Sequence, residues 1–440
     1  MKFKDLGLSK PLLDALARLD YHTPTPIQEQ AIPIVLKGQD LLGCAQTGTG
    51  KTAAFAIPII ERLLSHPSNN HFIKVLVVTP TRELAIQIEE NFKSYTHFTD
   101  LKTQVIFGGV KQGKQTDALR RKPDILIATP GRLLDLMNQG FISLKNIEYA
   151  VLDEADQMLD MGFIHDIKKL IAKLPNSRQS LFFSATMPKS IVELSGEILG
   201  NPQRITIKPE QATAEKITQA VYFVDKENKI KLLASLVEQS EAPAVLVFSR
   251  TKHGANNIVK KLDKFGIKGA AIHGNKSQAA RQKALEGFKE GKINVLVATD
   301  IAARGIDIDQ LSLVINYELP NVPETYVHRI GRTGRASASG VAISFCDETE
   351  IPYLQDIQKL IKQEVPVIKG HAFENESLEA ELLKKHHPKK GGKKPNPNER
   401  RSRRPQQNRN KRSGQRPQRP QRSQGSQGNG QKSNQNRSEN

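Results

Sequence analysis

The chain has 440 residues, 38% of them hydrophobic, and a formal net charge of +19. This length predicts two or three domains, and the basic excess favours a polyanionic partner, nucleic acid before an acidic membrane surface. The two cysteines, Cys44 and Cys346, lie far apart with no Cys or His cluster around either, which excludes a disulfide framework and a zinc site. With no apolar signal-peptide region and no apolar run near the roughly 20 residues of a membrane span, we expect a cytoplasmic protein without membrane contact.

The body of the chain alternates short apolar runs with helical patterns, such as the one over 83–88. Runs rich in β-branched and large apolar residues are typical of parallel strands buried on both faces. They fall at 75–78, 125–127, 149–152, 181–183, 245–248, 295–297 and 313–315. The alternation predicts doubly wound α/β layers. A polar stretch at 202–215, which we expect to be poor in strand, divides the body into two α/β domains.

The last part of the chain differs sharply in composition. Residues 384–440 hold 18 Lys and Arg against two acids and contain no Val, Ile, Leu, Phe or Tyr, whereas the rest is close to neutral. Such a segment cannot bury enough apolar surface to fold, so we expect a disordered basic tail. We favour an RNA-binding arm because the charge is uniformly positive, and the alternative is a tail that only improves solubility.

A phosphate-loop pattern occupies residues 45–52, with an alanine where the first glycine is usual. It follows an apolar stretch at 40–43 and opens a helical one, which is the context that the pattern requires. Backbone N–H groups and the helix N-terminus favour phosphate there, Lys51 would reach the β- and γ-phosphates, and Thr52 would bind Mg²⁺. The predicted ATP-binding residues of the loop are Ala45, Gln46, Thr47, Gly48, Thr49, Gly50, Lys51 and Thr52.

Two acidic residues, Asp153 and Glu154, follow the apolar run at 149–152. Open α/β sheets bind ligands beyond the carboxyl ends of their strands, so these carboxylates are candidates for the same site. Asp153 suits Mg²⁺, through water, and Glu154 suits activation of the attacking water. The alternative is a solvated acidic loop.

The second half has no phosphate loop, but it has a basic stretch at 328–335. Its arginines are poor core residues and are candidates for groups that reach a γ-phosphate. The alternative is a basic surface loop.

Together these residues resemble the DEAD-box RNA helicases of superfamily 2 over roughly residues 3–366, with about a dozen motifs in the family's order. The resemblance implies two tandem RecA-like doubly wound parallel-sheet domains plus the tail. We place an adenine-reading segment at 1–30, an ATP-binding domain at 31–205, a helicase C-terminal domain at 216–375 and the tail at 384–440. The short N-terminus and basic tail look most like the bacterial RhlE type.

The resemblance also assigns residues to ATP. Gln28 would read the adenine edge, and Asp307 matches the position near the ribose. Tyr21 or Phe3 would pack near the base, and the alternative for both is ordinary core packing. Arg332 and Arg335 match the two arginine fingers, which act with Lys51 and Glu154 in catalysis.

Two further sets follow from the resemblance. The residues that couple ATP to domain closure would be Asp156, Ser184, Thr186 and His328. The RNA-facing residues offer hydroxyls, backbone N–H groups or arginines that suit sugar and phosphate contacts without sequence readout. They are Thr81, Arg82, Gly108, Gly109, Thr129, Arg132, Arg250, Gly274, Gln278 and Thr299.

The sequence therefore predicts an RNA-dependent ATPase that uses ATP and Mg²⁺, closes a cleft on single-stranded or short duplex RNA and opens the duplex locally. The alternatives are an ATP-gated RNA clamp or assembly scaffold, and a DNA translocase. Ribosomal or RNA-decay proteins are candidate partners, and ribosome assembly, RNA degradation and cold adaptation stay open as cellular roles.

Overall fold

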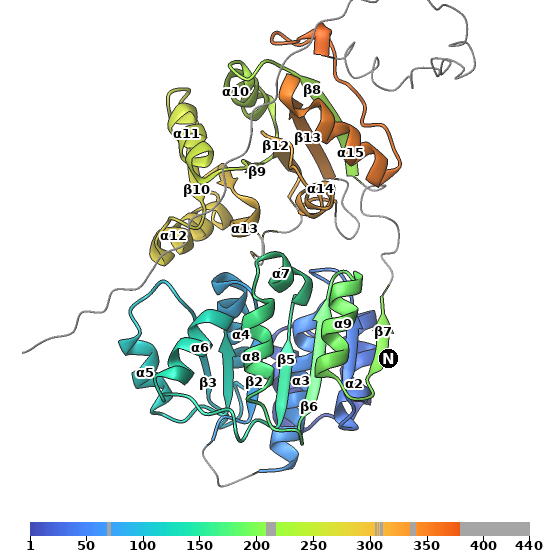
Figure 1. Ribbon diagram of the computed structural model, residues 1–440, viewed down its shortest axis with the longest axis vertical. Helices are drawn as coiled ribbons and strands as arrows, with labels where there is room; N and C mark the ends of the chain where they lie inside the picture. Colours follow the sequence, from blue (N-terminus) through green and yellow to red (C-terminus); the bar gives the residue numbers. More distant parts are fainter. Residues whose placement is uncertain are drawn as a thin grey trace, which may run out of the picture. The chain divides into compact units, whose positions relative to one another are not determined.

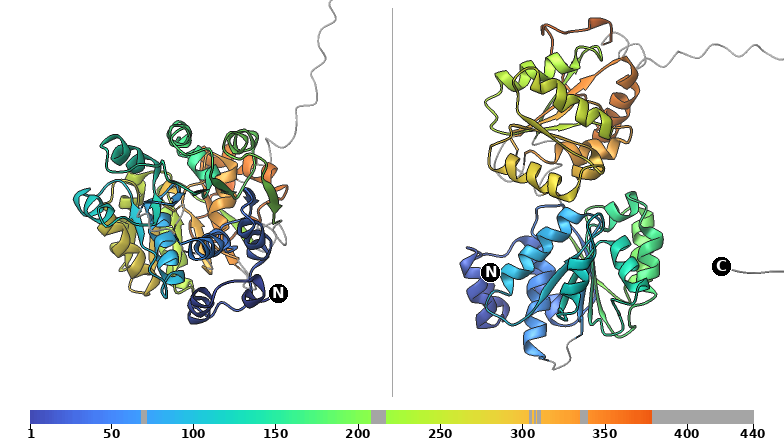
Figure 2. Two further views of the ribbon diagram at one scale, coloured as in Figure 1. Left: turned by 90° about the horizontal axis from the view of Figure 1, so that it is seen from below. Right: turned by 90° about the vertical axis from the view of Figure 1, so that its left-hand side faces the viewer.

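The computed structural model describes residues 1–67, 72–207, 217–303, 306, 308, 311–334 and 340–378. The tail predicted at 384–440 lies outside the described residues. Within them, the chain forms two parallel β-sheets, each with helices on both faces (Figures 1 and 2), as the alternating apolar runs predict. No helix of the described part is long and apolar enough to cross a membrane.

The first sheet has seven strands in the order β3-β4-β2-β5-β6-β1-β7, all parallel to their neighbours. The strands are β1 (Leu41–Cys44), β2 (Val75–Val78), β3 (Thr103–Ile106), β4 (Ile125–Ala128), β5 (Tyr149–Leu152), β6 (Gln179–Ser184) and β7 (Gln203–Thr206). Alternate buried residues of the strands from β1 to β6 enter separate cores. Val75 and Val77 pack in one cluster, and Leu76 and Val78 in the other.

Three helical segments precede the first strand, and helices fill connections between the strands that follow. They are η1 (Phe3–Leu6), α1 (Lys10–Arg18), α2 (Pro26–Leu36), α3 (Lys51–Ser65), α4 (Arg82–Tyr95), α5 (Gly113–Leu119), α6 (Pro130–Asn138), α7 (Ala155–Asp160), α8 (Ile164–Ile171) and α9 (Lys189–Ile198). The apolar residues of α3 are buried almost throughout, because this helix lies against the sheet and packs on α2 and α4 as well.

The second sheet has six parallel strands in the order β10-β11-β9-β12-β13-β8. They are β8 (Ile217–Phe223), β9 (Val245–Phe248), β10 (Gly269–Ile272), β11 (Val295–Ala298), β12 (Leu313–Asn316) and β13 (Gly340–Cys346). The helical segments are α10 (Lys229–Gln239), α11 (Lys252–Asp263), α12 (Gln278–Lys289), α13 (Asp300–Ala303), α14 (Pro323–Ile330), η2 (Glu348–Glu350) and α15 (Ile351–Ile361).

The two sheets share one topology. If β7 is set aside, β8 to β13 take the same places in the second sheet that β1 to β6 take in the first. In both sheets the carboxyl ends of all strands meet at one edge, because every pairing is parallel. Loops that are far apart in sequence are therefore brought together at that edge.

All seven apolar runs predicted as strands are strands in the structure. The expectation of a strand-poor break at 202–215 is wrong at its start, where β7 (Gln203–Thr206) adds an edge strand to the first sheet. Only Ile205 of this strand is buried, so an edge strand with one inward side chain carries too little apolar pattern to be recognised.

Candidate ATP and RNA site

The phosphate loop joins β1 to α3, which begins at Lys51. Gly48 and Gly50 have φ of +83° and +93°, a conformation that glycine adopts without steric cost. A Cβ at Gly50 would also collide with the side-chain amide of Gln28. Both glycines are thus required by the local backbone, and the helix N-terminus that follows is suited to phosphate.

Lys51 is a buried lysine, with a side chain 5% exposed. Its Nζ lies 2.7 Å from Oε1 of Glu154 and donates to the Ala45 carbonyl at 2.9 Å. Burial alone would lower the pKa of Lys51, but the carboxylates of Glu154 and Asp153 outweigh it and raise that pKa. The lysine therefore carries its charge inside the site.

Glu154 is held by three side chains. Besides Lys51, it accepts hydrogen bonds from Nε2 of Gln157 at 2.8 Å and from Oγ1 of Thr47 at 3.3 Å. Burial alone would raise the pKa of Glu154, but the ion pair with Lys51 outweighs it and lowers that pKa. The backbone of Glu154 is left-handed, with φ of +55°, a strained conformation for a non-glycine residue that is found mainly at functional sites.

A cavity of about 350 Å³ opens beside this pair. Its lining includes the loop residues Thr47 and Gly48, the acids Asp153 and Glu154, and Tyr21. The cavity has the size of a small-molecule site, and its wall combines a buried cation with N–H groups and carboxylates. This combination suits a nucleotide bound through its phosphates.

The residues suited to Mg²⁺ are Thr52 and Asp153, which both line the cavity. Burial and the neighbouring Glu154 raise the pKa of Asp153, and a cation beside it would favour its ionised form. Among the residues described, no group of three or more His, Cys, Asp or Glu could enclose a metal. Mg²⁺ fits such a site because it is commonly held by one or two protein oxygens together with phosphates and waters.

Gln28 is buried at the start of α2 and reaches the phosphate loop. Its Oε1 accepts from the Thr25 N–H at 2.9 Å, and its Nε2 donates to the Gly50 carbonyl at 3.1 Å. A glutamine amide has two donors and two lone pairs, so one of each is left for a base. Tyr21 is 39% exposed and stacks at 6.3 Å on Phe3, in keeping with a place near the base.

Three of the four predicted coupling residues form one network. Asp156 Oδ2 accepts from the N–H and hydroxyl of Thr186 at 2.9 and 2.8 Å, and Ser184 Oγ bonds the Asp156 N–H and the Thr186 carbonyl. The network joins the carboxyl end of β6 to the first turn of α7. His328 lies on α14, a helix of the second domain.

The predicted RNA-facing residues of the first sheet follow β2, β3 and β4, three adjacent strands. Gly109 has φ of +77°, and a Cβ there would collide with the guanidinium of Arg82. Arg132 donates to the Val110 carbonyl at 3.1 Å, while Thr81 caps α4 by accepting from the Leu84 N–H. The structure thus gathers Arg82 and Arg132 around the loop that contains Gly108 and Gly109.

The corresponding residues of the second sheet occupy the equivalent strands. Arg250 follows β9, Gly274 follows β10 and Thr299 follows β11, again three neighbours, and Gln278 begins α12. In each sheet the proposed RNA groups lie on one side of the carboxyl edge. In the first sheet the phosphate loop follows β1 and Glu154 follows β5, while Ser184 ends β6, all on the other side.

Of the two predicted arginine fingers, Arg332 lies just after α14, is 7% exposed and donates to the Ile306 carbonyl at 3.3 Å. Arg335 and Asp307 lie outside the described residues, so their assigned roles stay predictions.

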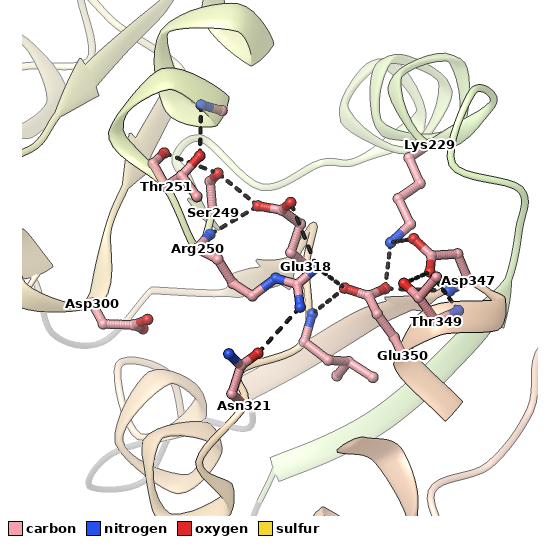
Figure 3. A network of polar contacts seen from close by, with 12 residues as sticks. Lys229, Ser249, Arg250, Thr251, Asp300, Glu318, Asn321, Asp347, Thr349 and Glu350 are labelled. Carbon is pink, nitrogen blue, oxygen red and sulfur yellow. Dashed lines mark hydrogen bonds and ion pairs between the residues drawn. The ribbon is translucent and has the colours of Figure 1, made fainter. Parts of the chain in front are cut away.

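Sequence reasoning missed a polar cluster in the second domain, and its expectation that the arginines of 328–335 are poor core residues is wrong for Arg329, whose side chain is 1% exposed. Arg329 donates to both carboxylate oxygens of Asp300, at 2.5 and 2.9 Å, and to the Glu318 carbonyl at 2.6 Å. Glu318 and buried Lys229 belong to the same region, which Figure 3 shows from close by. A signal was available, because Glu318 follows its strand by two residues, as Glu154 does.

The fold and this geometry define a class of protein, a nucleoside triphosphate hydrolase with a phosphate loop and an acidic residue at a parallel-sheet edge. Family models agree with the class. Residues 25–194 match the DEAD/DEAH box helicase family, and residues 228–337 match the helicase conserved C-terminal domain.

Relatives agree with the models. The ATP-dependent RNA helicase CshA of Limosilactobacillus reuteri is 42% identical over 362 residues, 82% of this chain and 72% of that protein. RhpA of Helicobacter pylori, also a DEAD-box ATP-dependent RNA helicase, is 43% identical over 82% of this chain and 73% of its own length. The structure of S. cerevisiae Dbp5 bound to RNA and ADP BeF3 matches with a TM-score of 0.74 and 31% identity, covering 87% of this chain and 98% of that one.

The chain belongs to the DEAD-box family of ATP-dependent RNA helicases. The predicted family and fold of two parallel-sheet α/β domains are confirmed, and so is the predicted class of enzyme, an RNA-dependent ATPase and helicase. The placing within the RhlE type stays a prediction.

Proposed function

We propose that the chain binds ATP and RNA cooperatively, closes its two domains on them, and opens short RNA duplexes locally. One observation carries the proposal: the first sheet has the ATP residues and the RNA residues on two halves of the same carboxyl edge. The loops that would bind the ATP phosphates are then only a few strands away from the loops that would contact RNA, so a change in one set can be passed to the other. The RNA and ADP BeF3 in the Dbp5 structure support this pairing of ligands.

The resting ion pair suggests how the reaction begins. Lys51 and Glu154 neutralise each other at 2.7 Å, and nucleotide phosphates would compete with Glu154 for the lysine. Glu154 would then be free to orient the attacking water, while Gln157 still holds its other oxygen. Bound Mg²⁺, held by Thr52 and Asp153, would neutralise charge on the phosphates.

Arg332 and Arg335 would supply the further charge that stabilises the transferring phosphoryl group. Release of phosphate would remove the group that these arginines bind, so the domains would reopen and the RNA would leave. RNA contacts through backbone groups give no sequence preference, and the work falls on short duplexes in the cytoplasm. Ribosome assembly and RNA degradation are both processes that this activity fits.

Strand displacement tests the proposal. With ATP, the protein should separate an RNA duplex of about ten base pairs in one cycle and fail on one of about thirty, because each step costs roughly 1–2 kcal/mol. A DNA duplex of the same sequence is the control for substrate class. If ATP hydrolysis is normal but no strand is displaced and RNA stays bound for many minutes, the protein is an ATP-gated RNA clamp instead.

A further inference from the structure

A carboxylate in the second domain joins the loops that follow two adjacent strands, β9 and β12. Oε2 of Glu318 accepts from Oγ of Ser249 and from the N–H of Arg250, both at 2.8 Å. Figure 3 shows the Glu318 carboxylate directed at this turn. Because a backbone N–H and the neighbouring hydroxyl bind the same oxygen, the turn that carries Arg250 is fixed relative to β12.

The guanidinium of Arg250 is held as well, but more loosely. Its Nη2 lies 3.9 Å from Oε1 of Glu318 and 3.4 Å from Oε1 of Glu350, and its Nη1 donates to Asn321 at 3.2 Å. The side chain keeps 27% of its surface exposed. It is therefore oriented by carboxylates on its inner side while part of it stays accessible to a phosphate.

A buried cluster holds the loop of Glu318 in turn. Oε1 of Glu350 accepts from the N–H of Leu319 at 3.0 Å. The other oxygen of Glu350 pairs with Lys229, which also lies 2.9 Å from Asp347. Lys229 and Glu350 are 1% and 0% exposed, so the base of the arrangement is sealed from water and rigid.

We propose that Glu318 is a positioning residue for RNA binding, which acts by holding Arg250 where its guanidinium meets an RNA phosphate. The inference rests on the proposed RNA contact of Arg250 and adds to it the group that orients the contact. The carbonyl of the same residue accepts from Arg329, so Glu318 also ties this turn to the helix that precedes Arg332.

The test is a double-mutant cycle on RNA affinity in the full chain, with a fluorescent single-stranded RNA as the probe. Arg250→Ala should weaken binding about tenfold, as expected for a lost charged hydrogen bond, and lower the salt slope by about 0.7 for one lost phosphate. Glu318→Ala should give a similar loss in both. The double variant should be no weaker than Arg250→Ala alone, because both changes remove one contact.

Two further variants separate positioning from folding. Glu318→Gln keeps an acceptor for the turn but loses the charge that faces the guanidinium, so its effect should be intermediate. Glu324→Ala is the matched control. It removes an exposed acid from the first turn of α14 whose side chain makes no hydrogen bond found within the described part of the chain. Thermal unfolding of all variants shows whether a loss of affinity follows a loss of fold.

A second readout is the RNA dependence of ATP hydrolysis. The RNA concentration for half-maximal stimulation should rise more than the maximal rate falls, because orientation of a binding group is lost. Additive effects of Glu318→Ala and Arg250→Ala, or an unchanged salt slope in Glu318→Ala, would overturn the positioning role. No effect of Arg250→Ala would also overturn it, and would place the fault in the assignment of Arg250 to RNA.

Discussion

Both domains bury a lysine against carboxylates at equivalent places in the fold. Lys51 begins the helix after β1 and Lys229 begins the helix after β8, the strand that takes the place of β1 in the second sheet. Lys51 pairs with Glu154, and Lys229 pairs with Asp347 and Glu350. The two lysines share their position, their charge and their burial, yet their surroundings differ.

The difference lies in what replaces the phosphate loop. Six residues, two of them glycines with positive φ, separate β1 from Lys51, and the lysine lines a cavity. Five residues without glycine separate β8 from Lys229, and two carboxylates from the segment after β13 take up its charge. In the second domain the protein supplies the anions that a nucleotide would supply in the first.

The carboxylates show the same contrast. The pKa of Glu154 is lowered overall, because Lys51 outweighs burial, whereas burial raises the pKa of Glu350 although Lys229 opposes it. Glu350 shares its lysine with Asp347, whose pKa is lowered overall in spite of burial. A buried lysine–carboxylate pair thus does not by itself identify a nucleotide site, and the first pair differs from the second by its adjoining cavity and its phosphate loop.

The largest effect expected is on turnover in Glu154→Gln. ATP hydrolysis at saturating RNA should fall by about 10²–10⁴, since the carboxylate that orients the water is lost while the shape is kept. Binding of ATP and RNA should persist. Glu148→Gln, at the exposed opposite end of β5, is the matched control. A wild-type rate in Glu154→Gln would remove Glu154 from the mechanism.

The buried cluster of Lys229, Asp347 and Glu350 should matter for stability instead of turnover. Lys229→Met leaves two buried carboxylates without their cation, and breaking such a cluster costs about 3–5 kcal/mol of unfolding free energy. Lys51→Met should cost less, because Glu154 lines a cavity from which water could solvate it once the lysine is removed. Urea unfolding of both variants measures the difference, with exposed Lys231→Met as the control. A greater loss of stability in Lys51→Met would contradict this view of the two sites.

The basic residues after Leu383 should add RNA affinity, and their deletion should leave the sites of Lys51 and Lys229 unchanged. If about 5 of their 18 cations contact phosphates, deletion of 384–440 reduces the salt slope by roughly 3.5, or about 100-fold in affinity between ~50 and ~200 mM salt. RNA-stimulated hydrolysis at saturating RNA should be retained. Binding measured across this salt range decides, and an unchanged slope would favour a tail that serves solubility only.

The sequence was informative where chemistry and pattern coincide. The phosphate loop, Asp153–Glu154 and the seven apolar strands have both a residue pattern and a local context, and the structure has them in place. In the cluster of Lys229, Glu318 and Glu350, only Glu318 has such a context, two residues after an apolar strand, and no motif surrounds it. Its members are separated by up to 121 residues and meet only because parallel strands end at one edge, which is a property of the folded sheet.

Two strands could not be predicted from the sequence, because they carry few large apolar side chains. The edge strand β7 has one inward side chain, and β10 begins with Gly269, Ala270 and Ala271, whose small side chains give little β signal. Gln28 illustrates a further limit of pattern. Its type suits adenine, but its bonds to Thr25 and Gly50 appear only in the folded protein.

The smallest effect expected is on the choice of base. Gln28→Ala should weaken the binding of ATP about tenfold, the equivalent of one or two lost hydrogen bonds. It should weaken the binding of a phosphate-only ligand such as tripolyphosphate much less. The preference for ATP over GTP should fall by the same factor, because the donor and acceptor left free on Gln28 suit adenine. Exposed Gln30→Ala on the same helix controls for changes in α2. If the binding of ATP and the binding of tripolyphosphate weaken equally, Gln28 acts only by supporting the loop at Gly50. The first site would then differ from the buried lysine of the second domain in binding phosphates, but not in reading the base.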